Sequence, residues 1–301
     1  MSPPEPSLPE PSPGDMLENR PRLPMSIIEA FVLGLVQGLT EFLPVSSSAH
    51  LVLVQHLLGF KEPMVFFDVV LHLGTLVGLF IYFGDDIAHL IRDSLYGISY
   101  LLYRKPMAKI AEIAPRSRWA LGILVASLPT GFIGIFFKDW LESLFGSLPA
   151  VGAALLVTSV ILWLTRYFQK NERGMEESKY ADFFFIGFLQ GVAIIPGVSR
   201  SGSTIAASLF RGFKREEAFR FSFLLSIPAI LGAGLVELKE GLSAGHQDWL
   251  SLGVGFLTSA FFGYLSIFLL SRLVRQGKLH RFAFYTLPLG ILILFLSRWL
   301  G

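Results

Sequence analysis

The hydrophobic positions of this chain fall into long, almost uncharged segments that are separated by short polar connections. Six of these segments approach or exceed the ~20 residues that a helix needs to cross a bilayer. They run over 66–83, 119–137, 149–167, 218–237, 249–270 and 282–300. The pattern therefore predicts an all-α polytopic membrane protein with six transmembrane helices. A mixed segment over 84–118 is expected to hold an amphipathic surface helix near 87–103.

Two further apolar segments are each broken into short halves by a proline, Pro44 in the first and Pro196 in the second. The halves cover 26–42 and 47–58 in the first segment, and 183–195 and 201–210 in the second. Each half by itself is too short to cross ~30 Å of hydrocarbon comfortably as a single helix. Each pair is therefore either one kinked span or a re-entrant helical hairpin.

The distribution of Lys and Arg favours hairpins. With two hairpins, eighteen basic residues fall on one face, in connections near 84–118, 166–180, 211–220 and 272–281. The opposite face carries only Lys61, Lys138, Lys239 and Arg298, plus Arg20 and Arg22 near the N-terminus. Because basic loops favour the cytoplasm, both termini are predicted outside. The first hairpin is then expected to enter from the outside and the second from the cytoplasm.

Composition supports a membrane protein and excludes several functions. Of 301 residues, 52% are hydrophobic and 16% are charged, against about 25% charged in a typical soluble domain. A net charge of +2 is too small to suggest nucleic acid as a partner, and the absence of cysteine excludes disulfides and thiolate chemistry. Residues 1–24 hold eight of the seventeen prolines, which predicts a disordered tail before a single integral-membrane domain over 25–301.

The two broken segments resemble each other at an offset of 153 residues. The run Gly34-Leu-Val-Gln37-Gly38 matches Gly187-Phe-Leu-Gln190-Gly191, and Ser46, Ser47 and Ser48 fall on Ser199, Arg200 and Ser201. The match predicts an inverted repeat, with the first copy over about 26–137 and the second over about 182–300. Inverted repeats with broken helices place a binding site near their interface, where half-helix N-termini point at an anion.

The first broken segment carries polar groups that are costly at membrane depth, which by default indicates a functional site. Gln37 and Glu41 are four residues apart and share one helix face. They either bond each other to hold the hairpin or serve the serines that follow. Asp68 and His72, also four apart, are either a second layer around this site or a structural pair.

Three serines start the second half-helix of this segment. Ser46, Ser47 and Ser48 suit an N-cap, and a helix N-terminus with free N–H groups also binds anions. His50 lies three residues after Ser47 and four after Ser46, so the spacing allows it to reach either hydroxyl. A Ser–His pair is the minimum for an activated nucleophile.

The second turn supplies a different set of groups: Ser199, Arg200, Ser201, Ser203 and Thr204. Arg200 lies between two long apolar segments, where it either snorkels to a headgroup or faces the site. A guanidinium fork with hydroxyls and helix N–H groups is what a phosphate needs. One turn therefore suggests a nucleophile with its base, and the other a phosphate cradle.

These motifs resemble those of the undecaprenyl-diphosphate phosphatase family of the bacitracin-resistance type. Its signatures, Glu/Gln-x-x-x-Glu and Pro-Gly-x-Ser-Arg-Ser-x-x-Thr, match Gln37 to Glu41 and Pro196 to Thr204. The resemblance covers about 26–300. It implies hydrolysis of undecaprenyl diphosphate to the monophosphate, which recycles the lipid carrier for peptidoglycan. It also implies a bacterial plasma membrane location, an active site facing outward, and a divalent cation such as Mg²⁺ or Ca²⁺.

The resemblance further implies a role for each matched residue. Ser47 or Ser46 would be the nucleophile, and His50 its base or the general acid. Glu41 would be a metal ligand or a base, and Arg200 the diphosphate clamp. Substrate positioning would fall to Gln37, where some members have Glu, and to Ser48, Ser199, Ser201, Ser203 and Thr204.

Two alternatives stay open at this point. Direct attack by water needs only Glu41 or His50 and no nucleophilic serine. Broken helices in inverted repeats are also a transporter architecture, so flipping of a polyprenyl phosphate is the alternative function. A pure transporter needs no Ser–His pair, which favours the phosphatase. The sequence allows a homodimer without requiring one.

Overall fold

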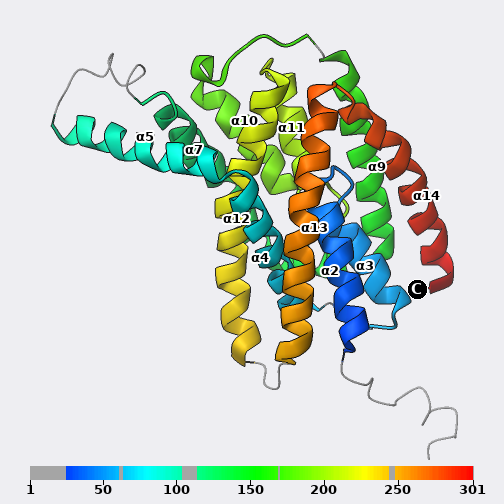
Figure 1. The fold of residues 1–301 in the computed structure, drawn as a ribbon. Helices are drawn as coiled ribbons and strands as arrows, with labels where there is room; N and C mark the ends of the chain where they lie inside the picture. The colour runs from blue at the N-terminus through cyan, green and yellow to red at the C-terminus, as the bar shows by residue number, and fades with distance from the viewer. Residues whose placement is uncertain (1–24, 61–63, 104–113, 169, 244–247, 301) are drawn as a thin grey trace, which may run out of the picture.

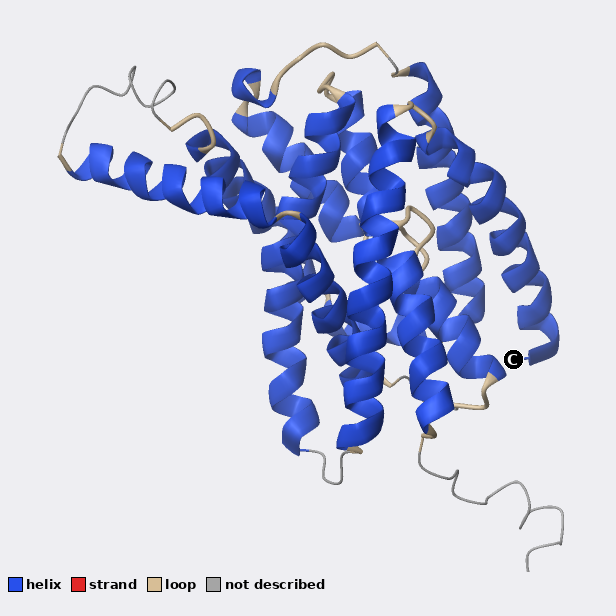
Figure 2. Cartoon of the chain, viewed as in Figure 1, coloured by secondary structure: helices blue, strands red, loops and turns tan. Residues whose placement is uncertain are grey.

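The computed structural model describes residues 25–60, 64–103, 114–168, 170–243 and 248–300. The predicted disordered tail, residues 1–24, lies outside them. Within these ranges the chain is all-helical, as Figure 2 shows. The α-helices are α2 (Ile27–Phe42), α3 (Ser47–Leu57), α4 (Val65–Tyr82), α5 (Gly84–Leu102), α7 (Ser117–Phe136), α8 (Lys138–Phe145), α9 (Leu148–Leu164), α10 (Tyr180–Val192), α11 (Arg200–Phe210), α12 (Arg215–Ser243), α13 (Trp249–Arg275) and α14 (Ala283–Leu300). Short 3₁₀ turns follow at η2 (Thr165–Tyr167), η3 (Met175–Glu177) and η4 (Leu279–Phe282).

Six helical stretches in the described ranges are long and apolar enough to cross a membrane, as predicted. They are Val65–Tyr82, Ser117–Phe136, Leu148–Tyr167, Arg215–Leu235, Trp249–Arg275 and Leu279–Trp299. Large apolar side chains such as Leu124, Leu128 and Phe261 are exposed on their outer faces. In water such a surface would drive aggregation, whereas in lipid it costs nothing. The chain is therefore a multi-pass membrane protein.

The two broken segments form helical hairpins, α2–α3 and α10–α11. Helix α2 ends where Leu43 turns extended (φ −65°, ψ 144°) before Pro44, because a residue that precedes proline is disfavoured in the helical region. Helix α11 begins and ends 153 residues after α3, and the N-caps Ser46 and Ser199 keep the same spacing. Figure 1 shows α2 beginning at one end of the bundle and α10 at the other.

Each hairpin is clasped by a long helix from the other half of the chain. Helix α13 packs along α2, and α7 packs along α10. Glycines allow the close approach: a Cβ at Gly38 would lie 2.9 Å from the Ser259 carbonyl oxygen. A hydroxyl then joins each pair of helices, since Ser266 donates to the Gly38 carbonyl and Thr130 to the Gly187 carbonyl, both at 2.9 Å. Each hairpin is thus held by a helix from the opposite half of the chain, and the two halves pack into one bundle.

The connections predicted to be basic lie together at one end of the molecule. Figure 1 places the α9–α10, α11–α12 and α13–α14 connections at the end where α5 projects from the bundle, and α2 begins and α14 ends at the opposite end. The surface helix predicted near 87–103 is confirmed as α5, but the basic residues within 104–113 lie outside the described residues. Arg116 and Arg220 both contact Asp86 at 2.7 Å, which ties α7 and α12 to α5.

Candidate active site

The turns of the two hairpins meet inside the bundle. The Gly197 N–H donates to the Ser48 hydroxyl at 3.3 Å, and the Ser201 hydroxyl donates to the Leu43 carbonyl at 3.3 Å. Both bonds join residues about 150 positions apart in the chain. The N-termini of α3 and α11, with the positive ends of their helix dipoles, are therefore brought to one place.

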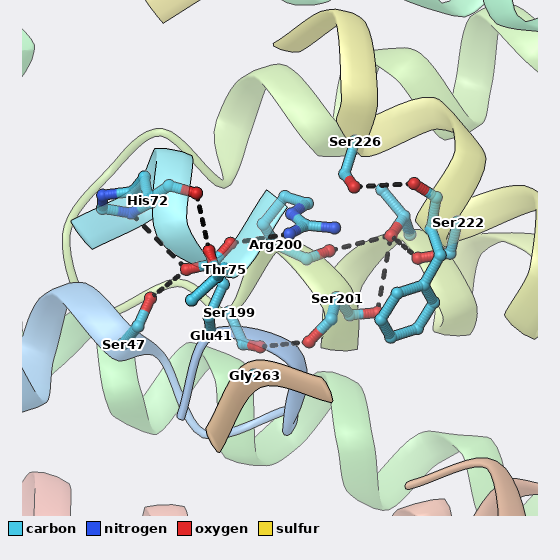
Figure 3. Close-up of polar contacts among 12 residues, drawn as sticks. Glu41, Ser47, His72, Thr75, Ser199, Arg200, Ser201, Ser222, Ser226 and Gly263 are labelled. Carbon is cyan, nitrogen blue, oxygen red and sulfur yellow. Dashed lines mark hydrogen bonds and ion pairs between the residues drawn. The ribbon is translucent and has the colours of Figure 1, made fainter. Parts of the chain in front are cut away.

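Glu41, in the last turn of α2, is the centre of the polar contacts there (Figure 3). Its Oε1 accepts a hydrogen bond from Arg200 Nη2 at 2.7 Å, and its Oε2 accepts one from the Ser47 hydroxyl at 2.7 Å. Gln37 Nε2 donates to the same Oε2 at 3.0 Å, which confirms that the two residues bond each other. His72 Nε2 lies 3.4 Å from this oxygen. We call Gln37, Glu41, Ser47, His72 and Arg200 the Glu41 cluster.

Arg200 is the cation of the cluster and is not fully used. Its side chain is 15% exposed and that of Glu41 is 6% exposed, so neither charge is well hydrated and each needs the other. Arg200 Nη1 is buried and has no hydrogen-bond partner in the described part of the chain. A guanidinium with one nitrogen on a carboxylate and another without a partner is suited to receive a second anion.

The backbone at the start of α3 is strained. Ser46 has φ 66° and ψ 95°, the positive-φ region that non-glycine residues rarely adopt, and it is the one such residue outside glycine among the described positions. Its hydroxyl caps the helix by accepting from Ala49 N at 3.4 Å and lies 3.1 Å from the Ser48 hydroxyl. The Ser46 hydroxyl thus bonds within its own turn, and Ser47 is the serine that contacts the Glu41 carboxylate in the described structure. Strained residues of this kind cluster at functional sites.

The expected hydrogen bond between His50 and a serine hydroxyl is not present. His50 Nδ1 contacts the Ser46 backbone oxygen at 2.8 Å, and because a carbonyl oxygen only accepts, Nδ1 carries the proton. His50 Nε2 then accepts from the Tyr285 hydroxyl of α14 at 2.7 Å, and the two rings stack. The contact expected from the spacing does not form because the imidazole bonds the Ser46 backbone and turns its other nitrogen to α14.

The second turn brings only part of its expected phosphate cradle to the cluster. Ser199 caps α11 by accepting from Gly202 N at 3.1 Å, and its own N–H donates to the Thr158 hydroxyl at 3.0 Å. The Thr204 hydroxyl donates to the Arg200 carbonyl at 2.9 Å and contacts Ser222 of α12. Ser203 is buried without a partner for its hydroxyl in the described ranges. Arg200 is the member of this set that contacts Glu41.

His72, whose role the sequence leaves open, lies at the site, as do Tyr285 and Thr158, which the sequence does not single out. His72 does not pair with the Asp68 carboxylate, which instead accepts from Gln55 Nε2 at 2.7 Å. Its Nδ1 contacts the Asp68 backbone oxygen at 2.7 Å. The histidine at membrane depth was the signal in the sequence. Tyr285 gave no such signal, because one tyrosine in an apolar helix is ordinary at a membrane interface.

The side chains around Glu41 include a small number of groups that could bind the expected divalent cation. No group of three or more His, Cys, Asp or Glu side chains gathers as a metal site within the described ranges. One carboxylate is present, with His72 Nε2 beside it and with Gln37 Oε1 buried and unpartnered in the described structure. Mg²⁺ is commonly held by one or two carboxylates plus substrate phosphates. The residues therefore fit an ion that a diphosphate helps to bind.

Comparison with known proteins gives consistent matches over most of the chain. The family described as "Bacitracin resistance protein BacA" matches residues 30–292. The protein named undecaprenyl-diphosphatase from Halothermothrix orenii is 45% identical over 276 residues, which cover 91% of this chain and 99% of the relative. Relatives of the same name from Desulfosudis oleivorans and Alkaliphilus metalliredigens are 45% and 42% identical, covering 92% and 91% of this chain and 99% of each relative.

Proposed function

The chain belongs to the bacitracin resistance protein BacA family, and we propose that it is an undecaprenyl-diphosphatase that works at the Glu41 cluster. It removes the terminal phosphate of undecaprenyl diphosphate and leaves undecaprenyl phosphate, the reusable lipid carrier. The observation that carries this proposal is the pair of 2.7 Å contacts that Glu41 makes with Ser47 and with Arg200. A hydroxyl, a base and a phosphate-binding cation are thereby joined at one carboxylate.

Arg200 binds the diphosphate in this proposal. Its Nη2 is held by Glu41, and its buried Nη1 lacks a partner within the described residues. A phosphate oxygen would accept the missing hydrogen bond from Nη1. The N-termini of α3 and α11 add further N–H donors and the positive ends of their helix dipoles. Ser46, Ser48, Ser199 and Ser201 hold the two turns in place through the bonds described above. Thr204 supports Arg200 from within α11 through its bond to the Arg200 carbonyl, and the unpartnered Ser203 hydroxyl stays assigned to substrate positioning.

Ser47 is the nucleophile in the proposed reaction. Its oxygen attacks the terminal phosphorus while its proton passes to the Glu41 carboxylate, with which Ser47 already forms a 2.7 Å hydrogen bond. The bond to the bridging oxygen breaks, undecaprenyl phosphate leaves, and water later hydrolyses the phosphoserine. Arg200 stabilises the charge on the equatorial oxygens. A divalent cation held by Glu41 and the diphosphate would add further neutralisation of that charge.

A trapping experiment distinguishes this route from direct attack by water. Acid quenching during turnover, followed by mass spectrometry, is expected to find phosphate on the peptide that carries Ser47. A fully active Ser47→Ala protein without phosphopeptide would show that water attacks directly. In that case Glu41 or His50 would be the base, and His50→Gln identifies which: unchanged turnover would assign the base to Glu41, and lost turnover would assign it to His50.

The orientation in the membrane is also part of the proposal. Both hairpins are re-entrant, α2–α3 from the outside and α10–α11 from the cytoplasm, so both termini lie outside and the site opens outward. The gathering of basic connections at the end opposite to the start of α2 supports this. The chain has no cysteine, so single-cysteine variants are clean reporters. In intact cells, an impermeant maleimide should label Arg298→Cys and spare Arg281→Cys. The reverse result would invert the topology.

Phosphate release by the purified protein tests the activity itself. With farnesyl diphosphate as a soluble-chain substrate, the wild type should release phosphate, and Arg200→Ala should lose about 10³-fold in turnover. Arg281→Ala, an exposed arginine of η4, is the matched control. Absence of phosphate release together with transport of polyprenyl phosphate into vesicles would favour the flippase instead. The homodimer stays a prediction, which sedimentation in detergent tests.

A further inference from the structure

His72 of α4 lies beside the catalytic carboxylate with one nitrogen turned toward it. Its Nδ1 contacts the Asp68 backbone oxygen at 2.7 Å, four residues earlier on the same helix. A carbonyl oxygen accepts and never donates, so the ring proton is on Nδ1. The second nitrogen, Nε2, then faces Glu41 Oε2 at 3.4 Å. In metal sites a ligating histidine is typically fixed in this way, with its other N–H on a backbone carbonyl.

The separation of these two atoms fits two ligands of one ion better than a hydrogen bond. A charge-assisted N–H···O⁻ bond measures about 2.7–2.9 Å, and Glu41 does reach 2.7 Å with Arg200. Two donors that each lie ~2.1 Å from one ion at roughly a right angle or slightly more are about 3.0–3.4 Å apart. The observed 3.4 Å between Nε2 and Oε2 therefore leaves room for an ion that bridges them.

A third donor lies next to the pair. Gln37 donates its Nε2 to Glu41 Oε2 at 3.0 Å, while its Oε1 is buried and has no partner anywhere in the described ranges. A buried amide oxygen without a hydrogen bond costs free energy, so it needs an explanation. An amide oxygen is a normal, if weak, ligand for a divalent cation.

We propose that His72 Nε2 and Glu41 Oε2, with Gln37 Oε1 as a weaker third donor, form a divalent-cation site that the substrate's diphosphate completes. An imidazole ligand favours Co²⁺ or Zn²⁺ over Ca²⁺, which takes oxygen ligands, whereas Mn²⁺ resembles Mg²⁺ in its preference for oxygen and serves below as the spectroscopic probe. The proposal rests on the function proposed above and adds to it the ligand set. Position 37 is Gln in this chain, whereas some members of the family have Glu there. The His72 imidazole of α4 supplies the strong ligand that a second carboxylate would otherwise provide.

Manganese provides a spectroscopic test on the full-length protein in detergent. Mn²⁺ is titrated by the loss of its free EPR signal, with and without a non-hydrolysable farnesyl diphosphonate. The bound ion is then examined by spin-echo modulation, which detects a directly bonded ¹⁴N nucleus. Wild-type protein should show imidazole coupling, and the diphosphonate should tighten Mn²⁺ binding. His72→Gln should abolish the coupling and weaken binding by more than the roughly 10–100-fold expected for loss of an outer-layer partner.

Two further variants keep the test decisive. His56→Gln alters a histidine of α3 that contacts the Glu41 cluster through no side-chain bond in the described structure, and it should retain both the coupling and the affinity. His72→Glu should retain Mn²⁺ binding through a carboxylate but lose the ¹⁴N coupling, which separates ligation from misfolding. Coupling that survives in His72→Gln, or bound Mn²⁺ without any ¹⁴N coupling in the wild type, would overturn the proposal.

Phosphate release measured on the same samples tests the proposed function separately from the metal site. Phosphate release from farnesyl diphosphate by wild-type protein that binds no Mn²⁺ would reject the metal site and leave the hydrolase standing. The contact with Glu41 would then be an imidazolium–carboxylate ion pair. Mn²⁺ binding with imidazole coupling but without phosphate release would keep the site and reject the hydrolase.

Discussion

The two hairpins are copies of one element that carry opposite chemistry. Helices α3 and α11 have equal length, both begin after a capping serine, and both follow a proline-broken helix. At the offset of 153 residues, Gln37 falls on Gln190 and the capping serines coincide, but Glu41 falls on Ile194 and Ser47 falls on Arg200. The frame is shared, whereas the acid and the nucleophile are in one copy and the guanidinium is in the other.

This difference explains why neither hairpin is a site by itself. Glu41 alone would be a buried carboxylate, and Arg200 alone would be a buried cation, and both are costly without a partner. Meeting at 2.7 Å, they neutralise each other and still leave Arg200 Nη1 for a phosphate. A duplicated frame with divergent turns is thus a simple way to build an asymmetric site between symmetric elements.

The largest loss of activity is expected at Ser47, the position of the first hairpin that corresponds to Arg200 in the second. Ser47→Ala should lower phosphate release by about 10³-fold or more, because the attacking oxygen is gone. Ser46→Ala, its neighbour in the same turn, should lose only a few-fold, since its hydroxyl contacts Ala49 N and Ser48 rather than Glu41. The reverse order of the two activities would move the nucleophile to Ser46.

The charge pair between the hairpins should appear in stability as well as in activity. Arg200→Met leaves Glu41 without its guanidinium, and removal of one partner of a buried pair costs about 3–5 kcal/mol of unfolding free energy. The double variant Glu41→Gln/Arg200→Met should recover most of this loss in chemical denaturation, yet stay inactive. Independent, additive losses in the two single variants and the double variant would contradict the coupling.

Gln37 and Gln190 occupy equivalent positions in the two hairpins, but only Gln37 contacts the catalytic carboxylate. Gln37→Ala removes a hydrogen bond to the catalytic carboxylate, which is worth about 1.5–3 kcal/mol, so turnover should fall about 10–100-fold. Gln190→Ala removes a 3.3 Å bond to the Thr130 hydroxyl and should cost ~1 kcal/mol of stability with turnover changed by less than about threefold. Equal losses of turnover in both variants would mean that both copies serve the reaction.

The smallest effect concerns the capping serines. Ser46 has a φ of 66°, whereas Ser199 has a φ of −72°. Glycine relieves the positive φ at position 46 and replaces a cap at a cost of a few tenths of a kcal/mol. Ser46→Gly should therefore leave thermal stability unchanged or slightly raised, while Ser199→Gly should lower it by about 0.5 kcal/mol. A larger loss at Ser46 would show that its hydroxyl bonds outweigh the backbone strain.

The sequence by itself determined the helices and the frame of the site. Runs of apolar residues set the membrane helices because only length and hydrophobicity are needed to stabilise a helix in lipid. Pro44 set the end of α2 by excluding the helical conformation before it. The repeat and the two motifs identified Glu41, Ser47 and Arg200, since polar groups at membrane depth are expensive enough to stand out.

Only the tertiary structure decided which of these groups touch. Side-chain contacts between residues 159 positions apart, such as Glu41 and Arg200, depend on how α7 and α13 clasp the hairpins, and helical periodicity carries no information on that. The same holds for His50, which packing turns to Tyr285 on α14, and for His72, which α4 delivers to Glu41. Spacing along one helix predicts which residues share a face, but the neighbouring helix determines what that face meets.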